Sequence, residues 1–87
     1  MIKYYVYILK CKDNTLYTGI TTDLVQRINK HNQGTGAKYT RGRTPVQLMY
    51  YESGYTKSEA LKREISIKKL TRIQKEKLIK DFNDTKI

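Results

Sequence analysis

The chain has 87 residues, a length that permits one domain whose core is just large enough to fold without disulfides or structural metal. Eighteen Lys and Arg against eight Asp and Glu give a formal net charge of +10, and such a positive field attracts polyanions, nucleic acid first among them. The single cysteine, Cys11, excludes an intramolecular disulfide and a zinc site built on cysteines.

Charge by itself specifies neither a target sequence nor a reaction, because a basic surface also serves solubility alone. The first residues lack the apolar run of a signal peptide, and no apolar stretch approaches the roughly 20 residues of a membrane helix. We therefore expect a soluble, cytoplasmic protein without a membrane partner, in which residues 1–87 form one domain.

The N-terminal segment predicts a β-hairpin. Residues 3–10 are rich in aromatic and β-branched side chains, residues 15–20 repeat this composition, and Asp13-Asn14 between them is typical of a turn.

Two tyrosine tripeptides, Tyr5-Val6-Tyr7 and Tyr17-Thr18-Gly19, lie on these strands. Because side chains alternate between the faces of a strand, Tyr5 and Tyr7 share one face, and Tyr17 is expected opposite or diagonal to Tyr7. Gly19 suits a place where backbone or ligand must approach closely, and a simple bulge explains it equally well.

A helix is predicted next, capped by Thr22 or Asp23 and continuing to about Lys30, since Asp23 with Gln26 approximates a capping box. Its expected apolar face consists of Leu24, Val25 and Ile28. Arg27 and His31 stand four residues apart, so they lie one turn apart on one side and can converge on a target outside that face. Such pairs are also common on plain solvated helices.

Residues 32–45 contain three glycines and one proline and predict a long loop. Lys38, Arg41 and Arg43, with Tyr39 among them, combine cations with an aromatic ring, as nucleic-acid contacts do. A flexible solvated loop is an equally good interpretation.

The C-terminal half predicts a strand over residues 46–52 and two helices. Thr56 and Thr71 begin capping boxes, with Tyr55 placed to pack on Ala60, and the first helix ends near Lys69. The expected core residues are Leu61 and Ile65 of the first helix and Ile73, Leu78, Ile79 and Phe82 of the second, whereas residues 84–87 should fray. The order β-β-α-β-α-α predicts an α+β domain, a small three-stranded antiparallel sheet flanked by helices.

With both tripeptides in order, Arg27 and His31 on one helix, and Glu64 on another, the chain resembles the GIY-YIG nuclease superfamily over nearly its whole length. The loop over residues 37–45 and the helix over residues 60–69 resemble those of its small, standalone bacterial members.

The resemblance implies divalent-metal-dependent phosphodiester hydrolysis, with Mg²⁺ or Mn²⁺ bound by Glu64, the general base at Tyr17 or Tyr7, and Arg27 on the phosphate. An ordinary phenol pKa of about 10 makes tyrosine a poor base, so nearby cations or the metal must favour the phenolate. His31 matches a position where relatives carry histidine or tyrosine, and it would move a proton or bond a phosphate oxygen.

We therefore expect an endonuclease or structure-selective nuclease that acts on DNA rather than RNA, in repair or processing. Several relatives carry a lysine directly after the second tripeptide, where this chain has Ile20.

The alternative is a nucleic-acid-binding module with weak or no catalysis, recruited by a protein partner. Plainer interpretations also remain open at single residues: Tyr7 and Tyr17 as core aromatics, and Glu64 as an ion-pair partner of Lys68.

Overall fold

The computed structural model describes residues 2–85, and it confirms the predicted α+β class and the order β-β-α-β-α-α. The strands are β1 (Tyr4–Lys10), β2 (Leu16–Thr21) and β3 (Gln47–Tyr55). The helices are α1 (Leu24–Asn32), α2 (Lys57–Lys68) and α3 (Arg72–Asp84), with a short 3₁₀ turn, η1 (Lys38–Thr40), before β3.

The three strands form one antiparallel sheet in the order β2-β1-β3, so β1 lies in the centre. In the register of β1 and β2, Tyr7 faces Gly19 and Leu9 faces Tyr17. Tyr17 is therefore diagonal to Tyr7, which is one of the two predicted positions. Asn14 takes φ 68° in the connecting turn, a conformation that asparagine tolerates better than most residues.

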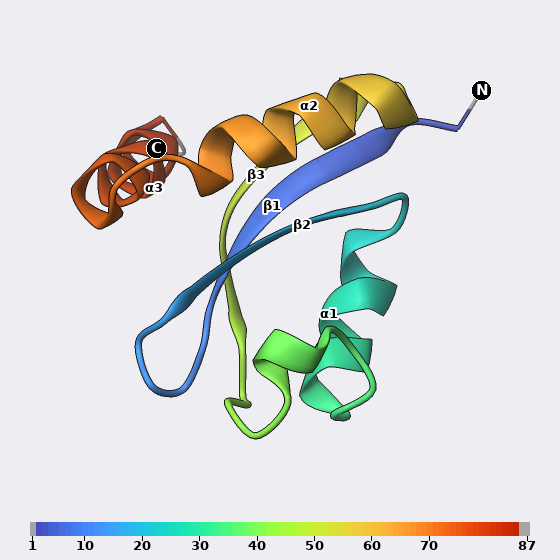
Figure 1. The fold of residues 1–87 in the computed structure, drawn as a ribbon, viewed down its shortest axis with the longest axis vertical. Coiled ribbons are helices and arrows are strands. Elements are labelled where there is room, and N and C mark those ends of the chain that lie inside the picture. Colours follow the sequence, from blue (N-terminus) through green and yellow to red (C-terminus); the bar gives the residue numbers. More distant parts are fainter. Residues whose placement is uncertain (1, 86–87) are drawn as a thin grey trace.

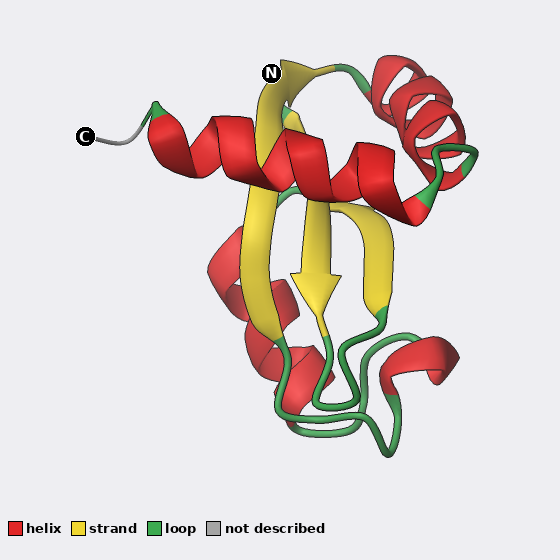
Figure 2. Ribbon diagram, turned by 90° about the vertical axis from the view of Figure 1, so that its left-hand side faces the viewer, coloured by secondary structure: helices red, strands yellow, loops and turns green. Residues whose placement is uncertain are grey.

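Helices cover both faces of the sheet (Figure 1), which explains why the central strand is apolar on both sides. Val6 and Ile8 pack with residues of α2 and α3, whereas Tyr7 and Leu9 pack with residues of α1. Figure 2 shows α3 crossing in front of the strands and α1 behind them. The face that carries Tyr7 is thus the face turned toward α1.

Side-chain caps start the helices much as predicted. Complete capping boxes join Thr56 to Glu59 and Thr71 to Gln74, and Tyr55 packs in the same core cluster as Ala60. At α1 only half of the box forms: the Asp23 carboxylate accepts from the Gln26 backbone N–H at 3.1 Å.

The predicted burial of four apolar side chains is wrong. Val25 is 72% exposed, Leu61 41%, Ile65 53% and Ile73 78%. The side of each helix that faces the sheet instead consists of residues spaced four and then three apart: Leu24, Ile28 and His31 on α1, and Ala60, Glu64 and Ile67 on α2. Each of these two sets includes one polar residue, His31 or Glu64. Sequence reasoning grouped apolar residues, whereas the orientation of each helix on the sheet decides which side it buries. On α3, Leu78, Ile79 and Phe82 pack into the core as predicted.

The main differences from the predicted elements lie in the third strand and in the loop before it. Strand β3 continues past residue 52 to Tyr55, and the loop of residues 32–45 contains η1, which buries Thr40. Residues 84 and 85 end α3 in an ordered turn, while residues 86 and 87 of the expected frayed end lie outside the described residues. Within residues 2–85, no helix combines the length and apolar character that a bilayer crossing requires.

Candidate active site

The hydroxyl of Tyr7 lies at the centre of the candidate site. It is 3.1 Å from His31 Nε2 and accepts from Arg27 Nε at 3.4 Å, although the tyrosine as a whole is only 1% exposed. Gly19 on β2 leaves room for this ring, since a Cβ there would lie 2.6 Å from the Tyr7 hydroxyl. Strand β1 and helix α1 therefore bring the first tyrosine, the arginine and the histidine together, with the glycine beneath them.

His31 is fully buried, contrary to the expectation of a polar helix face. Its Nδ1 is 2.8 Å from Thr40 Oγ1, and the Thr40 hydroxyl donates to the Ala37 carbonyl at 2.9 Å. Because that hydroxyl has one proton, it can only accept from Nδ1, which must carry the hydrogen. Nε2 of the neutral ring is then an acceptor, and the Tyr7 hydroxyl donates to it.

Burial sets the protonation of this pair. It lowers the pKa of His31, with the charge of Arg27 acting in the same direction. Burial also raises the pKa of Tyr7, although the hydrogen bond from Arg27 opposes the shift. At neutral pH the site therefore holds a neutral imidazole and a protonated Tyr7.

Arg27 lies beside the phenol of Tyr7, to which its Nε donates. The hydrogen bond to Tyr7 raises the pKa of the guanidinium, and Tyr17 contributes in the same direction. Among residues 2–85 no carboxylate lies within ion-pair distance of it. Its charge is thus held beside the phenols and is not neutralised by an acid, as binding of a phosphate requires.

Glu64 stands on the inner face of α2, four residues after Ala60 and three before Ile67, and its side chain is 17% exposed. After the larger influences of burial, Arg27 and Tyr17, the charge of Glu64 also raises the pKa of Tyr7, so the carboxylate is within electrostatic reach of the site. It also forms the anticipated pair with Lys68, at 3.7 Å.

The donor set suits a hard divalent cation held by few protein ligands. Within residues 2–85 no three His, Cys, Asp or Glu side chains gather into a metal-binding cluster, so Glu64 would be the single carboxylate ligand of an ion bound there. Mg²⁺ commonly binds through one or two carboxylates, with water and substrate phosphate completing its coordination. Glu64 fits such an ion.

Tyr17 is covered by a stack of side chains from the loop. The ring of Tyr39 stacks on Tyr17 with centroids 5.8 Å apart, and the Arg43 guanidinium lies 4.6 Å from the Tyr39 centroid on an aromatic face. Arg43 also pairs with Asp13 at 2.7 Å. Of the predicted nucleic-acid contacts, Arg43 is thus engaged within the protein, whereas Lys38 and Arg41 are exposed.

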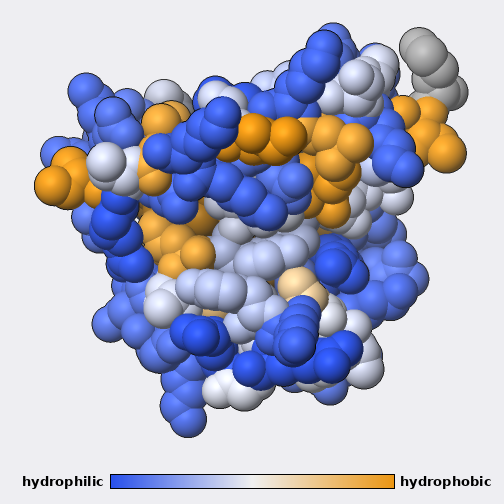
Figure 3. Space-filling model, viewed as in Figure 1, coloured by the Kyte–Doolittle hydropathy of each residue, from blue (hydrophilic) through white to orange (hydrophobic). Residues whose placement is uncertain are grey.

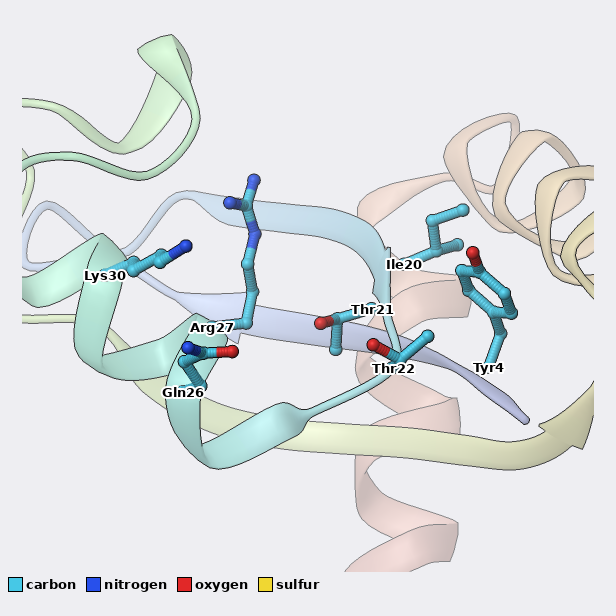
Figure 4. Close-up of a pocket in the computed structure, with 7 residues that line it drawn as sticks. All are labelled: Tyr4, Ile20, Thr21, Thr22, Gln26, Arg27 and Lys30. Atoms are coloured by element: carbon cyan, nitrogen blue, oxygen red, sulfur yellow. The ribbon is translucent and has the colours of Figure 1, made fainter. Parts of the chain in front are cut away.

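A pocket of about 280 Å³ adjoins the site through Arg27. It lies between the end of β2 and α1 (Figure 4). Seven residues line it: Tyr4, Ile20, Thr21, Thr22, Gln26, Arg27 and Lys30. The residue after the second tripeptide, Ile20, therefore belongs to the wall of this pocket.

Sequence reasoning missed three residues that shape the site. Thr40 fixes the tautomer of His31, Lys30 lines the adjoining pocket, and Gly36 lets the loop lie against the imidazole, since a Cβ there would be 2.5 Å from His31 Nδ1. The spacing of Lys30, three residues after Arg27, signals a shared helix side. Nothing local in the sequence points to Thr40, because its role depends on how the loop folds back.

Comparison with known proteins agrees with this geometry. Residues 3–77 match the GIY-YIG catalytic domain. The UPF0213 protein of Staphylococcus saprophyticus is 59% identical over 81 residues, which are 93% of this chain and 99% of that one. The counterpart in Clostridium perfringens is 64% identical over 75 residues, covering 86% and 81% of the two chains.

Two solution NMR structures are also similar to this chain. The UPF0213 protein of Bacillus halodurans has a TM-score of 0.57 at 50% identity, covering 90% of this chain and 83% of its own. A protein from E. faecalis has a TM-score of 0.62 at 47% identity, covering 93% and 86%. Sequence motifs, fold and relatives agree, and the chain belongs to the GIY-YIG superfamily, among its small UPF0213 proteins.

Proposed function

We propose that this protein is a divalent-metal-dependent endonuclease that cleaves phosphodiester bonds in DNA. One observation carries the proposal: Arg27 has no carboxylate partner in the described chain and donates to Tyr7, whose ring centroid lies 6.3 Å from that of Tyr17. A guanidinium without an acidic partner can bind the oxygens of a phosphate through paired hydrogen bonds.

In the proposed reaction, Arg27 binds a non-bridging oxygen of the scissile phosphate and stabilises the charge that develops there. Tyr17 is only half-buried, so it reaches the attacking water and acts as general base. Tyr7 is buried and stays protonated, with its hydroxyl donating a hydrogen bond to His31 Nε2. The same hydroxyl orients Arg27 by accepting a hydrogen bond from Nε.

A divalent ion held by Glu64 would lower the pKa of bound water and stabilise the leaving oxygen. Glu64 itself is oriented by its place on the inner face of α2, between two residues that are fully buried. The basic surface of the protein draws the polyanion toward the site.

Incubation of the purified protein with branched, nicked and single-stranded DNA in Mg²⁺ or Mn²⁺ tests this proposal. Wild type should cleave at least one substrate, and Glu64→Ala should lose the activity by at least ~100-fold. A matched control is Glu76→Ala on α3, an exposed carboxylate that also forms an i,i+4 pair and should cleave as wild type does. Identical backgrounds for wild type and Glu64→Ala on every substrate would disprove catalysis.

The second candidate is a DNA- or RNA-binding module with weak or no catalysis, which a protein partner recruits. Two observations favour it: Ile20 rather than a cation lines the pocket beside Arg27, and Glu64 is paired with Lys68. This function predicts salt-sensitive binding that survives Tyr17→Phe and Glu64→Ala. Cleavage that depends on Glu64 rules it out.

A further inference from the structure

The pocket beside Arg27 has the composition of an anion site. Apart from Tyr4, its polar wall consists of two cations, an amide and two threonine hydroxyls: Arg27, Lys30, Gln26, Thr21 and Thr22. No acidic side chain lines it. In Figure 4 the hydroxyls of Thr21 and Thr22 and the amide of Gln26 face the space beside Arg27, and Lys30 reaches toward it from the next turn of α1.

Most of these groups are available to a ligand. Lys30, Gln26 and Thr22 are exposed, and within residues 2–85 no carboxylate lies within ion-pair distance of Lys30. The Thr21 hydroxyl is engaged by the turn before α1, where it accepts from the Asp23 backbone N–H at 3.2 Å. An unpaired ammonium, an amide and a free hydroxyl around one space suit the oxygens of a phosphate.

Arg27 connects the pocket to the reacting groups. Its Nε donates to Tyr7, whereas its terminal nitrogens extend beyond that bond, and the same side chain lines the pocket. A DNA strand whose scissile phosphate lies on Arg27 therefore brings a neighbouring phosphate of the same DNA strand to Lys30. We propose that this pocket is a second phosphate subsite, which holds the phosphodiester next to the cleaved bond through Lys30, Gln26 and Thr22.

This inference rests on the proposed function but assigns a separate task, binding without chemistry, to residues that form no hydrogen bond or ion pair with Tyr7 or Glu64 within residues 2–85. Lys30→Gln should therefore weaken DNA binding and raise KM while kcat stays within about twofold of wild type. Lys30→Arg, which preserves the charge, should bind as wild type does.

The salt dependence of DNA binding, measured in EDTA by fluorescence anisotropy, tests the subsite. Each lost phosphate contact lowers the slope of log K against log salt by roughly 0.7 to 0.9. Lys30→Gln should show that decrease, whereas Lys77→Gln, which removes the same charge from an exposed position on α3, should keep the wild-type slope. Equal slopes for the two variants, with wild type binding normally, would overturn the subsite alone; no binding by wild type would overturn the proposed function as well.

A neutral methylphosphonate beside the cleaved bond distinguishes a bound strand from a free phosphate in the pocket. With this substrate KM should rise for wild type but change little for Lys30→Gln, because the variant has already lost the contact. If the neutral linkage affects wild type and Lys30→Gln equally, the phosphate next to the cleaved bond does not lie at Lys30, and the inference is wrong.

Discussion

At the scale of single residues, His31 is the side chain whose role the structure changes most. A histidine four residues after an arginine suggests a second ligand for phosphate, but the ring is fully buried and both nitrogens are engaged, by Tyr7 and Thr40. We therefore expect His31 to orient Tyr7 rather than to contact substrate. Thr40 is a positioning residue for the same pair, because its hydroxyl fixes which nitrogen of His31 is protonated.

Replacement of Thr40 by valine should release the tautomer of His31. The isosteric change removes the acceptor of Nδ1–H and should cost about 1–3 kcal/mol of stability, since a buried donor loses its partner. Two-bond ¹H–¹⁵N NMR correlations should show a protonated Nδ1 in wild type and in Thr40→Ser, and a mixture of tautomers in Thr40→Val. A wild-type ring protonated at Nε2 contradicts the assignment.

The free energy of unfolding should fall as the pH drops below about 6.5, the ordinary histidine pKa. Burial lowers the pKa of His31 in the folded state, so the unfolded chain binds a proton at higher pH than the folded chain does. The contribution of the neutral His31 to stability is therefore complete above a pH of about 6.5. Below that pH the free energy of unfolding falls by at most ~1.4 kcal/mol per pH unit.

Urea unfolding at pH 7.5, 6.5 and 5.5 measures this dependence. Since His31 is the single histidine, His31→Gln should show the same stability at all three values, whatever its absolute stability. Equal stability of wild type across the range contradicts the expected dependence.

At the scale of elements, the inner face of α2 carries two charged residues with different environments. Arg63 forms a bidentate pair with Glu52 of β3, with its Nη2 2.8 Å from Oε2, and Tyr55 donates to the same carboxylate at 2.6 Å. Burial acts to raise the pKa of Glu52, but the hydrogen bonds from Arg63, Tyr50 and Tyr55 outweigh it and lower it to about 2. Arg63 therefore joins β3 to α2, whereas Glu64 beside it pairs with Lys68.

Glu52→Gln should reduce stability by about 1–3 kcal/mol, because it leaves the half-buried Arg63 without its anion. Glu76→Gln, which removes an exposed carboxylate from an i,i+4 pair with Arg72, should cost no more than about 0.5 kcal/mol. Chemical denaturation of both variants at pH 7 measures the difference. Equal costs would indicate that the link between β3 and α2 contributes little.

At the scale of the whole molecule, the net charge of +10 is spread over a largely hydrophilic surface. Figure 3 shows one face, where blue side chains surround a paler strip that runs beneath the apolar band over α2. The loop after α1 adds two exposed cations, Lys38 and Arg41, whereas its third, Arg43, joins Asp13 and stacks on Tyr39. Not every cation of the loop is therefore available to nucleic acid.

Neutralising Lys38 and Arg41 together, as a double glutamine variant, should weaken DNA binding and lower the salt slope by about 1 to 2. Arg43→Gln should mainly reduce stability, by about 0.2–1 kcal/mol, since its exposed ion pair is lost. The control Lys77→Gln/Lys80→Gln removes the same charge from exposed positions of α3. A control that weakens binding as much as the loop variant would show that only the net charge matters.

The amino-acid sequence alone determined the element order, the two capping boxes and the placement of Tyr7 and Tyr17 on neighbouring strands. These features depend on local interactions, namely the alternation of side chains along a strand, the chemistry of turns and the hydrogen bonds of helix caps. The motif residues were identifiable for the same reason, since their spacing along the chain is itself the signal.

Only the tertiary structure decided which side of each helix is buried. It placed His31 and Glu64 on inner faces, left Leu61 and Ile65 exposed, and brought Thr40 from a glycine-rich loop onto the imidazole. Packing against the sheet fixes the rotation of a helix, and long-range closure of the loop fixes the partners of a buried ring. Neither follows from the order of residues, so the protonation of the site and the pocket beside Arg27 emerge only in three dimensions.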